Sequence, residues 1–257
     1  MQSVMLKQEE LPYEIDEELK MLRTNIQFTG ADKKVLLLTS AFSGEGKSTT
    51  ALNLCRSFTE LGKRVLLVDA DMRNSGFMKM LKGSAPVFGL SHYLSGQCEM
   101  DEMICSSDIK NLSVIVSGKV PPNPAELLAR PAMKTLIDTC TKYCDYIVID
   151  CPPLGMVVDA AVVAPLCDGA MLVIEAGEVK YRLAQEIVDK MRNTSCPILG
   201  VILNKVGYSA NGKYYGHYGK YGKYGKYGYG KYGKYGYGHY GKYGKPAETD
   251  SKPAKKD

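Results

Sequence analysis

The sequence has no tryptophan, only five phenylalanines, and no run of 18 uninterrupted apolar residues. A helix that spans a bilayer needs about 20 predominantly apolar residues, so we expect no membrane-crossing segment. The first twenty residues are polar and acidic and contain no apolar core of the kind that a secretory signal peptide requires. These absences argue against a secreted protein and against an integral membrane protein.

Cysteine motifs are also missing, although the chain has eight cysteines. None stands in a Cys-x-x-Cys motif, and none is paired with histidine at zinc-site spacing. Cys140 and Cys144 are four residues apart on an expected helix, a spacing that suits half-buried packing better than a metal site. The pattern favours a protein of the reducing cytoplasm.

The tract 208–245 lacks acidic residues and has no aliphatic side chain larger than alanine. It contains 13 Tyr, 12 Gly, 8 Lys and 2 His, arranged largely as Gly-Lys-Tyr repeats. A three-residue period fits neither a helix nor a strand, and the tract offers too little apolar surface to offset roughly 1–2 kcal/mol of backbone entropy per ordered residue. We therefore predict an N-terminal segment at 1–33, a folded domain at 34–207, and a flexible tail at 208–257.

The positive charge belongs to this tail. The whole chain carries +5 and the tract 208–245 carries +8, while residues 246–257 balance three lysines against three acids, so residues 1–207 carry the difference, −3. A basic balance usually indicates nucleic acid or anionic lipid as a partner. Here it describes the tail alone, and no specific nucleic-acid partner is expected.

Continuous apolar runs alternate with helical patterns before the tail. Such runs are typical of strands buried on both faces of a parallel sheet, and they lie at 33–40, 63–71, 145–153, 169–177 and 196–205, with a weaker one at 111–118. Helical patterns lie at 16–29, 48–61, 124–143, 158–167 and 180–194, and short helices with loops are expected at 74–110. The alternation predicts an α/β fold, a parallel sheet with helices on both faces.

A glycine-rich stretch, AFSGEGKST at 41–49, follows the first run and opens a helix. It is close to the Gly-x4-Gly-Lys-Ser/Thr pattern, with alanine at the first glycine position. In such a P-loop, backbone N–H groups wrap the phosphates, Gly44 and Gly46 permit close approach, Lys47 reaches the outer phosphates and the Ser48 hydroxyl binds Mg²⁺. The strand before it and the helix after it disfavour a chance glycine-rich turn. The expected ATP ligands are Ser43, Gly44, Glu45, Gly46, Lys47, Ser48 and Thr49.

Three aspartates end two further apolar runs: Asp69 and Asp71 in VLLVDADMR, and Asp150 in IVIDCPP. Carboxylates at the carboxyl ends of parallel strands face the crevice where open α/β sheets bind ligands. Opposite a P-loop they can hold Mg²⁺ and leave one carboxylate as a base. A helix-capping role explains a single such residue better than it explains three. The sequence therefore predicts a P-loop NTPase fold that binds ATP with Mg²⁺.

The chain resembles the bacterial tyrosine kinases of polysaccharide-assembly systems over about residues 17–245. The stretches that carry the resemblance are RTNIQF (23–28), SGEGKST (43–49), VLLVDADMR (65–73), GLSHYLSG (89–96), GKVPPNPAELL (118–128), IVIDCPP (147–153) and the tyrosine cluster. Relatives often have Arg-Pro where this chain has Asn74-Ser75.

The resemblance implies a role for each matching residue. Lys47 would contact the phosphates, Ser48 and Asp150 would belong to the Mg²⁺ shell, and Asp71 would support Mg²⁺ through water. Asp69 would be the base toward the acceptor phenol, whose ordinary pKa near 10 makes a proton acceptor useful. The catalytic set is thus Lys47, Asp69 and Asp71. The expected phosphoacceptors are Tyr214, Tyr215, Tyr218, Tyr221, Tyr224, Tyr227, Tyr229, Tyr232, Tyr235, Tyr237, Tyr240 and Tyr243.

The resemblance also implies self-assembly and partners. The family's Glu-x-x-Arg-x-x-Arg helix for ring formation corresponds here to Glu17, Lys20 and Arg23, and Lys20 lacks the planar fork of the arginine that it replaces. A transmembrane activator, the polysaccharide co-polymerase, would recruit the cytoplasmic kinase to the inner membrane face. A tyrosine phosphatase would counteract it, and the pair would regulate capsular or exopolysaccharide synthesis and export.

A second interpretation stays open, a P-loop ATPase of the partitioning or division-site type with an adhesive or polyanion-binding tail. Lysines contact phosphates and tyrosine rings stack on bases or sugars, and the two can also drive self-association. Those ATPases carry an extra lysine early in the P-loop, where this chain has Phe42. Polyanion binding would weaken steeply with salt, whereas transfer to the tail would depend on the P-loop.

Overall fold

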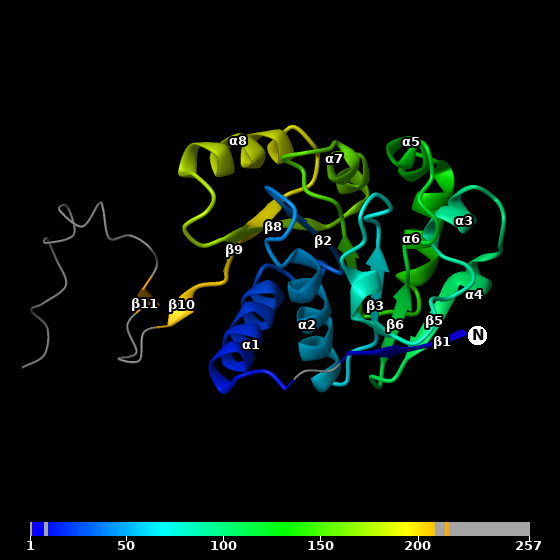
Figure 1. Cartoon of the computed structure of the whole chain (residues 1–257), viewed down its shortest axis with the longest axis horizontal. Coiled ribbons are helices and arrows are strands. Elements are labelled where there is room, and N and C mark those ends of the chain that lie inside the picture. The colour runs from blue at the N-terminus through cyan, green and yellow to red at the C-terminus, as the bar shows by residue number, and fades with distance from the viewer. Residues whose placement is uncertain (1, 8–9, 209–213, 216–257) are drawn as a thin grey trace, which may run out of the picture. The chain divides into compact units, whose positions relative to one another are not determined.

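A computed structural model describes residues 2–7, 10–208 and 214–215 (Figure 1). Within this part of the chain nine strands form one sheet, in the order β4-β1-β5-β6-β3-β7-β2-β8-β9. The strands are β1 (Gln2–Leu6), β2 (Val35–Ser40), β3 (Val65–Asp69), β4 (Leu81–Lys82), β5 (Ile104–Ser107), β6 (Leu112–Ile115), β7 (Tyr146–Asp150), β8 (Gly169–Glu175) and β9 (Ile198–Asn204). Two further strands, β10 (Gly207–Tyr208) and β11 (Tyr214–Tyr215), pair with each other antiparallel.

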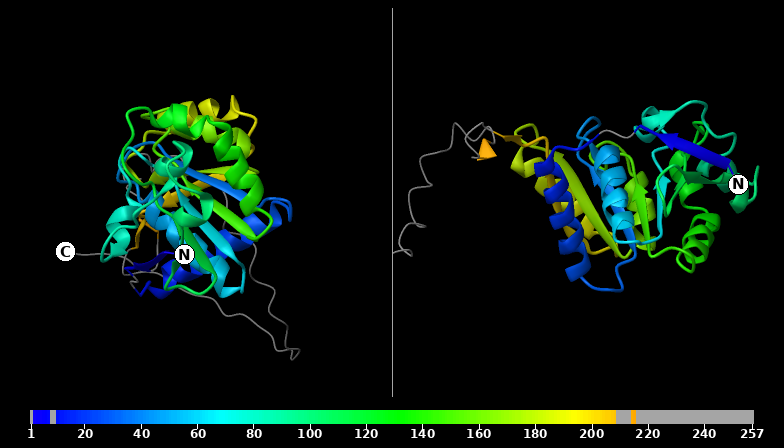
Figure 2. Two further views of the ribbon diagram at one scale, coloured as in Figure 1. Left: turned by 90° about the vertical axis from the view of Figure 1, so that its right-hand side faces the viewer. Right: turned by 90° about the horizontal axis from the view of Figure 1, so that it is seen from below.

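Helices cover both faces of the sheet (Figure 2). They are α1 (Tyr13–Phe28), α2 (Lys47–Glu60), α3 (Leu90–Leu94), α4 (Met100–Met103), α5 (Pro124–Leu128), α6 (Pro131–Cys140), α7 (Asp159–Val163) and α8 (Tyr181–Arg192), with short 3₁₀ helices η1 (Phe77–Met80) and η2 (Ala164–Leu166). One apolar cluster lies under α1 and α2, and the other lies under α3 to α8. The predicted α/β fold with helices on both faces is confirmed.

Side chains of the central strands alternate between the two clusters. Val35 and Leu37 of β2 belong to the cluster under α3–α8, whereas Leu36 and Leu38 belong to the cluster under α1 and α2. All four are buried, because successive side chains of a strand point to opposite faces of a sheet that is covered on both sides. Because both faces of these strands are buried, their sequences are continuous apolar runs.

The sheet is parallel at its centre and mixed at one edge. Strands β6, β3, β7, β2, β8 and β9 pair in parallel, as predicted. Beyond β6, however, β5 runs antiparallel to β6 and β4 antiparallel to β1. We did not predict β1, β4 or β5, since these edge strands are short and lack long apolar runs. The expectation of only helices and loops at 74–110 is wrong for β4 and β5.

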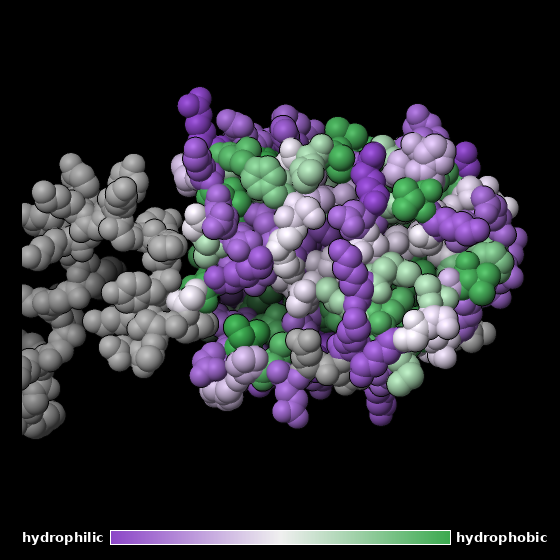
Figure 3. All heavy atoms as spheres, in the orientation of Figure 1, coloured by the Kyte–Doolittle hydropathy of each residue, from purple (hydrophilic) through white to green (hydrophobic). Residues whose placement is uncertain are grey.

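Two predicted helices need correction. The pattern at 124–143 is two helices, because Arg130 takes an extended conformation before Pro131, as a residue before proline favours. Helix α1 begins three residues earlier than expected, and it buries Leu19 and Ile26 but leaves Met21 exposed. On the face shown in Figure 3, hydrophobic residues are interspersed with hydrophilic ones.

The sheet brings the predicted site residues to one edge. The P-loop follows β2, and β7 separates β2 from β3. Asp69 ends β3 directly opposite Asp150, which ends β7. The chain divides into two units, residues 1–219 and 220–257, and the second lies outside the described residues. Among the described helices, none is both long and apolar enough to cross a membrane.

Candidate nucleotide and phosphotransfer site

The loop between β2 and α2 has the backbone geometry of a phosphate cradle. Gly44 and Gly46 have φ angles of 93° and 83°, the left-handed region that glycine adopts without strain. A Cβ on Gly46 would lie 2.1 Å from Nδ2 of Asn204, and that nitrogen donates to the carbonyl oxygen of Glu45 at 2.8 Å. Glycine is therefore required at 46 both for conformation and for space.

The Glu45 side chain forms hydrogen bonds that stabilise this loop, and it does not face the pocket beside the loop. Its side chain is buried, and its carboxylate accepts hydrogen bonds from the backbone N–H of Phe42 at 2.7 Å and of Glu175 at 3.3 Å. Of the seven predicted ATP ligands, Glu45 alone does not line the pocket beside the loop. Only its backbone can serve a phosphate.

The pocket has a volume of about 330 Å³. Its lining contains the other six predicted ATP ligands and one of the three aspartates, Asp71, together with Asn74 and Gly76. The Asp71 carboxylate accepts the backbone N–H of Asn74 at 3.0 Å. Two of the predicted Mg²⁺ ligands, Ser48 and Asp71, thus share one pocket.

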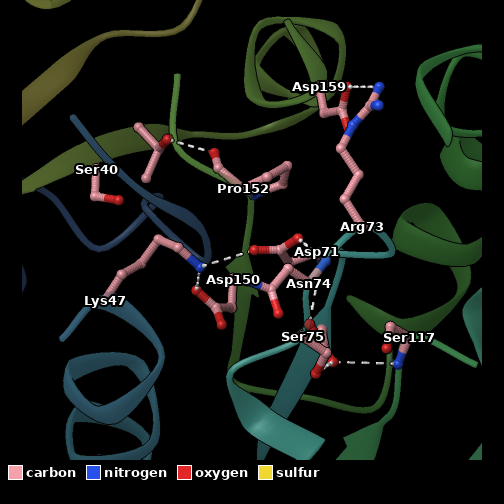
Figure 4. Close-up of polar contacts among 12 residues, drawn as sticks. Ser40, Lys47, Asp71, Arg73, Asn74, Ser75, Ser117, Asp150, Pro152 and Asp159 are labelled. Atoms are coloured by element: carbon pink, nitrogen blue, oxygen red, sulfur yellow. Dashed lines mark hydrogen bonds and ion pairs between the residues drawn. The ribbon is translucent and has the colours of Figure 1, made fainter. Parts of the chain in front are cut away.

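The side chain of Lys47 extends from the P-loop toward Asp150 and Asp71 (Figure 4). Its Nζ forms an ion pair with Asp150 and lies 4.0 Å from Oδ2 of Asp71. Burial works against the charged ammonium, but the carboxylates of Asp150, Asp71 and Asp69 outweigh it and raise the pKa of Lys47. The lysine is therefore cationic where phosphates would bind.

One carboxylate oxygen of Asp150 has no hydrogen-bond partner among the described residues. This atom is Oδ2, and the side chain that carries it is fully buried. An orphaned buried carboxylate oxygen is costly. A cation or an ordered water beside Ser48 and Asp71 would satisfy it, so these residues fit the Mg²⁺ that the P-loop implies.

Asp69 is fully buried beneath the pocket. Its Oδ2 atom accepts a hydrogen bond from the Ser75 hydroxyl and from the backbone N–H of Ser117 at 3.3 Å, and its Oδ1 atom accepts the N–H of Asp71 at 3.2 Å. Burial, and then the charge of Asp150, raise the pKa of Asp69 to about 7. A carboxyl with a pKa near the working pH is suited to proton transfer.

The structure adds an ion pair that sequence reasoning missed. Arg73 donates from Nε at 2.8 Å and from Nη2 at 2.9 Å to the carboxylate of Asp159, which is fully buried at the start of α7. This bidentate pair joins the loop after β3 to the start of α7 (Figure 4). The signal available was Arg73 within the VLLVDADMR motif, but nothing in the sequence indicated its partner 86 residues away.

The three predicted self-assembly residues do not form one surface. Lys20 is paired with Asp16 at 2.8 Å and Glu17 at 2.9 Å on the solvent side of α1. Arg23 points inward, donating to the backbone oxygen and, at 3.1 Å, to the hydroxyl of Ser57. Arg23 thus fastens α1 to α2, while Glu17 and Lys20 stay exposed.

Of the predicted phosphoacceptors, the backbones of Tyr214 and Tyr215 are described, in β11. The other ten, from Tyr218 to Tyr243, lie outside the described residues.

Comparison with known proteins agrees with this geometry. Residues 33–191 match the AAA domain family, so the chain is a P-loop nucleotide-binding protein. It is 43% identical to the tyrosine-protein kinase CpsD of Streptococcus agalactiae over 76% of this chain and 85% of that protein. The kinase domain of the Escherichia coli tyrosine kinase ETK superposes with a TM-score of 0.69 at 30% identity, over 78% of this chain and 80% of that one. The chain belongs to the bacterial tyrosine-protein kinase family, as its motifs indicated.

Two further matches are more distant in sequence. The succinoglycan biosynthesis transport protein ExoP of Rhizobium meliloti is 36% identical over 72% of this chain, which spans only 24% of ExoP. The septum site-determining protein MinD of Pyrococcus horikoshii, with a TM-score of 0.57 at 23% identity over 70% of this chain and 73% of that one, shares the fold alone. The division-site interpretation is therefore the weaker one.

Proposed function

We propose that this kinase transfers the γ-phosphoryl group of ATP to the tyrosines of its own C-terminal tract. The observation that carries the proposal is the convergence of Lys47 and three aspartates at the carboxyl edge of the sheet, beside a P-loop pocket. Phosphoryl transfer needs charge neutralisation and in-line positioning more than covalent chemistry. A cationic lysine and clustered carboxylates meet that need.

Each side chain takes a role that follows from its position. Lys47 would exchange its bond to Asp150 for the outer phosphates. Ser48, Asp71 and Asp150 would hold Mg²⁺, directly or through water, and when bound this ion neutralises charge on the phosphates. The backbone of 43–49 would wrap the phosphates, with Glu45 holding the loop in shape.

Asp69 would accept the proton of the acceptor phenol. Its pKa of about 7 is close to neutral pH, where a group with this pKa is both partly ionised and a strong enough base. Because the carboxyl is fully buried, the loop that covers it has to move before a phenol can reach it.

The tract 208–245 is the substrate in this proposal. Each phosphate adds about −1.5 to −2 charge at neutral pH, so modification of about half of its 13 tyrosines would reverse the +8 charge of the tract. Glycines beside nearly every tyrosine leave the phenols accessible, and little selectivity among them is expected. The segment 208–257 would thus act as a charge switch.

The proposal extends to location and partners. ExoP carries a region similar to this chain within a much longer protein, which supports the idea that here a separate transmembrane co-polymerase supplies the remainder. It would recruit the kinase from the cytoplasm to the inner membrane face, where the kinase regulates capsular or exopolysaccharide synthesis. Ring-shaped self-assembly through α1 and a counteracting tyrosine phosphatase complete the proposal.

The test is the intact mass of the full chain after incubation with ATP and Mg²⁺, with and without the cytoplasmic segment of a candidate co-polymerase. A ladder of phosphate additions is expected for the wild type. Lys47→Met and a chain that ends at Lys205 should stay unmodified. ATP hydrolysis without any phosphate on the protein, under every condition, would refute the proposal.

A further inference from the structure

The loop between β3 and η1, residues 70–76, contains Asp71 and contacts two further predicted site residues, Asp69 and Ser48. The N–H of Asn74 binds Asp71 at 3.0 Å, and the hydroxyl of Ser75 binds Asp69. A Cβ on Gly76 would lie 2.7 Å from the Ser48 hydroxyl, so this loop rests directly on a predicted Mg²⁺ ligand. Ser75, between Asn74 and Gly76, makes the contact with the proposed base.

The direction of this hydrogen bond is fixed when the Asp69 carboxyl is ionised, as a base has to be. An ionised carboxylate can only accept, so the single proton of the Ser75 hydroxyl points at Oδ2 of Asp69. Oγ of Ser75 in turn accepts the backbone N–H of Met78 at 2.9 Å. The N–H of Ser117 donates to the same oxygen, and Ser75 and Ser117 approach it from two different loops (Figure 4).

A base in phosphotransfer to tyrosine has to accept a hydroxyl proton across about 2.6–3.2 Å. Ser75 already provides a hydroxyl in this arrangement, on an oxygen that a second donor shares and that solvent does not reach. A phenol that donates to Oδ2 of Asp69 would have to displace the Ser75 hydroxyl, whereas the N–H of Ser117 could remain.

We propose that Ser75 competes with the acceptor: its hydroxyl occupies, at Oδ2 of Asp69, the position that the tyrosine hydroxyl takes during transfer, and the N–H of Ser117 belongs to the same subsite. This inference rests on the role of Asp69 in the proposed function. Ser75 would thereby set the apparent affinity for the acceptor, and it would not affect the affinity for ATP.

The test uses the full chain and an added peptide of Gly-Lys-Tyr repeats. Initial rates are measured over a range of peptide concentrations at saturating Mg²⁺ and ATP, and over a range of ATP concentrations at a fixed, high peptide concentration. Ser75→Ala should lower the KM for the peptide about three- to tenfold and leave the KM for ATP unchanged. Ser75→Thr, which keeps the hydroxyl, should behave as the wild type. Ser75→Cys, with a weaker donor of similar size, should lie between them and gives a second reading if the alanine variant folds poorly.

A matched control is Ser107→Ala. The Ser107 hydroxyl likewise accepts a backbone N–H, that of Ile109 at 3.1 Å, and it donates to the oxygen of Leu112 at 2.9 Å. Ser107 is the last residue of β5 and does not line the nucleotide pocket. This variant should leave both KM values unchanged.

Each remaining outcome is decisive. An unchanged or raised peptide KM in Ser75→Ala overturns the proposal, while transfer to tyrosine in all variants still supports the proposed function. A lower kcat with an unchanged peptide KM, restored by Ser75→Thr, would make Ser75 a residue that positions Asp69, and competition would be excluded. If no variant phosphorylates the peptide while ATP is hydrolysed, the proposed function fails and the acceptor subsite with it.

Discussion

At the scale of single residues, the fold holds carboxylates of like charge close together in the site. Asp69 and Asp150 are direct neighbours across two parallel strands, both are fully buried, and one lysine lies among them. Clustered carboxylates of this kind are unfavourable without cations. The nucleotide-free protein should therefore be more stable when one of these charges is removed.

The raised pKa of Asp69 gives this idea a pH dependence. The carboxyl titrates at about 7 in the folded protein and near 3.8 in the unfolded chain, so between these values the unfolded state binds fewer protons. Stability therefore falls as the pH rises through this window. Between pH 5 and 8 the wild type should lose more free energy of unfolding than Asp69→Asn, and the difference should be about 2 kcal/mol.

The measurement is urea unfolding without nucleotide at a series of pH values. Asp138→Asn is the control, since this carboxyl lies in an exposed pair with Lys134 on α6 and carries the same formal charge. Parallel pH profiles for wild type and Asp69→Asn would show that Asp69 is ionised at ordinary pH after all.

Lys47 provides a second prediction at this scale. Lys47→Met leaves Asp150 buried and unpaired, and breaking a buried ion pair in this way typically costs about 3–5 kcal/mol. The double variant Lys47→Met/Asp150→Asn should recover much of this loss, although neither variant should transfer phosphate. Thermal or urea unfolding measures both, and a double variant no more stable than Lys47→Met would argue against the pairing.

At the scale of elements, α1 is held to α2 by one buried arginine. Arg23 contacts Ser57 twice and lies 3.6 Å from Glu60, while Lys20 stays on the exposed face with Asp16 and Glu17. Of the three predicted self-assembly residues, Arg23 thus faces inward toward α2, whereas Glu17 and Lys20 face solvent.

We expect Arg23 and Lys20 to respond differently to substitution. Arg23→Ala should lower the free energy of unfolding by about 1–3 kcal/mol, because buried backbone and hydroxyl oxygens lose a charged donor. Lys20→Ala should leave the unfolding midpoint unchanged but alter the oligomeric state if α1 mediates self-assembly. Urea unfolding and light scattering on the same samples separate these effects, and equal destabilisation by both variants would contradict this expectation.

The elements also show what the sequence could predict. The central strands and their helices follow from apolar periodicity, and the P-loop with its three aspartates follows from short-range motifs. The pairs that complete the site, Arg73 with Asp159 and Ser117 with Asp69, join residues 86 and 48 positions apart. Such long-range contacts depend on strand order, which periodicity does not encode. The edge strands β1, β4 and β5 escape prediction for another reason, since they are short and lack continuous apolar runs.

At the scale of the whole molecule, the chain combines an acidic folded part with a basic tract. Residues 1–207 carry −3 and the tract 208–245 carries +8. Under the proposed function, phosphorylation would give the tract a negative charge, the same sign as that of residues 1–207, and salt would screen the resulting change in interaction. We expect the P-loop site of this chain to phosphorylate this tract.

The most direct measurement of that claim is to locate the phosphates. Between Asp189 and Glu248 the sequence has no acidic residue, so a glutamate-specific protease releases all 13 tyrosines of the tract in one fragment. After incubation with ATP and Mg²⁺, mass spectrometry should find a series of phosphate additions on this fragment, and none on it in Lys47→Met. An unmodified fragment from protein that still hydrolyses ATP, or phosphates confined to the rest of the chain, would contradict the account.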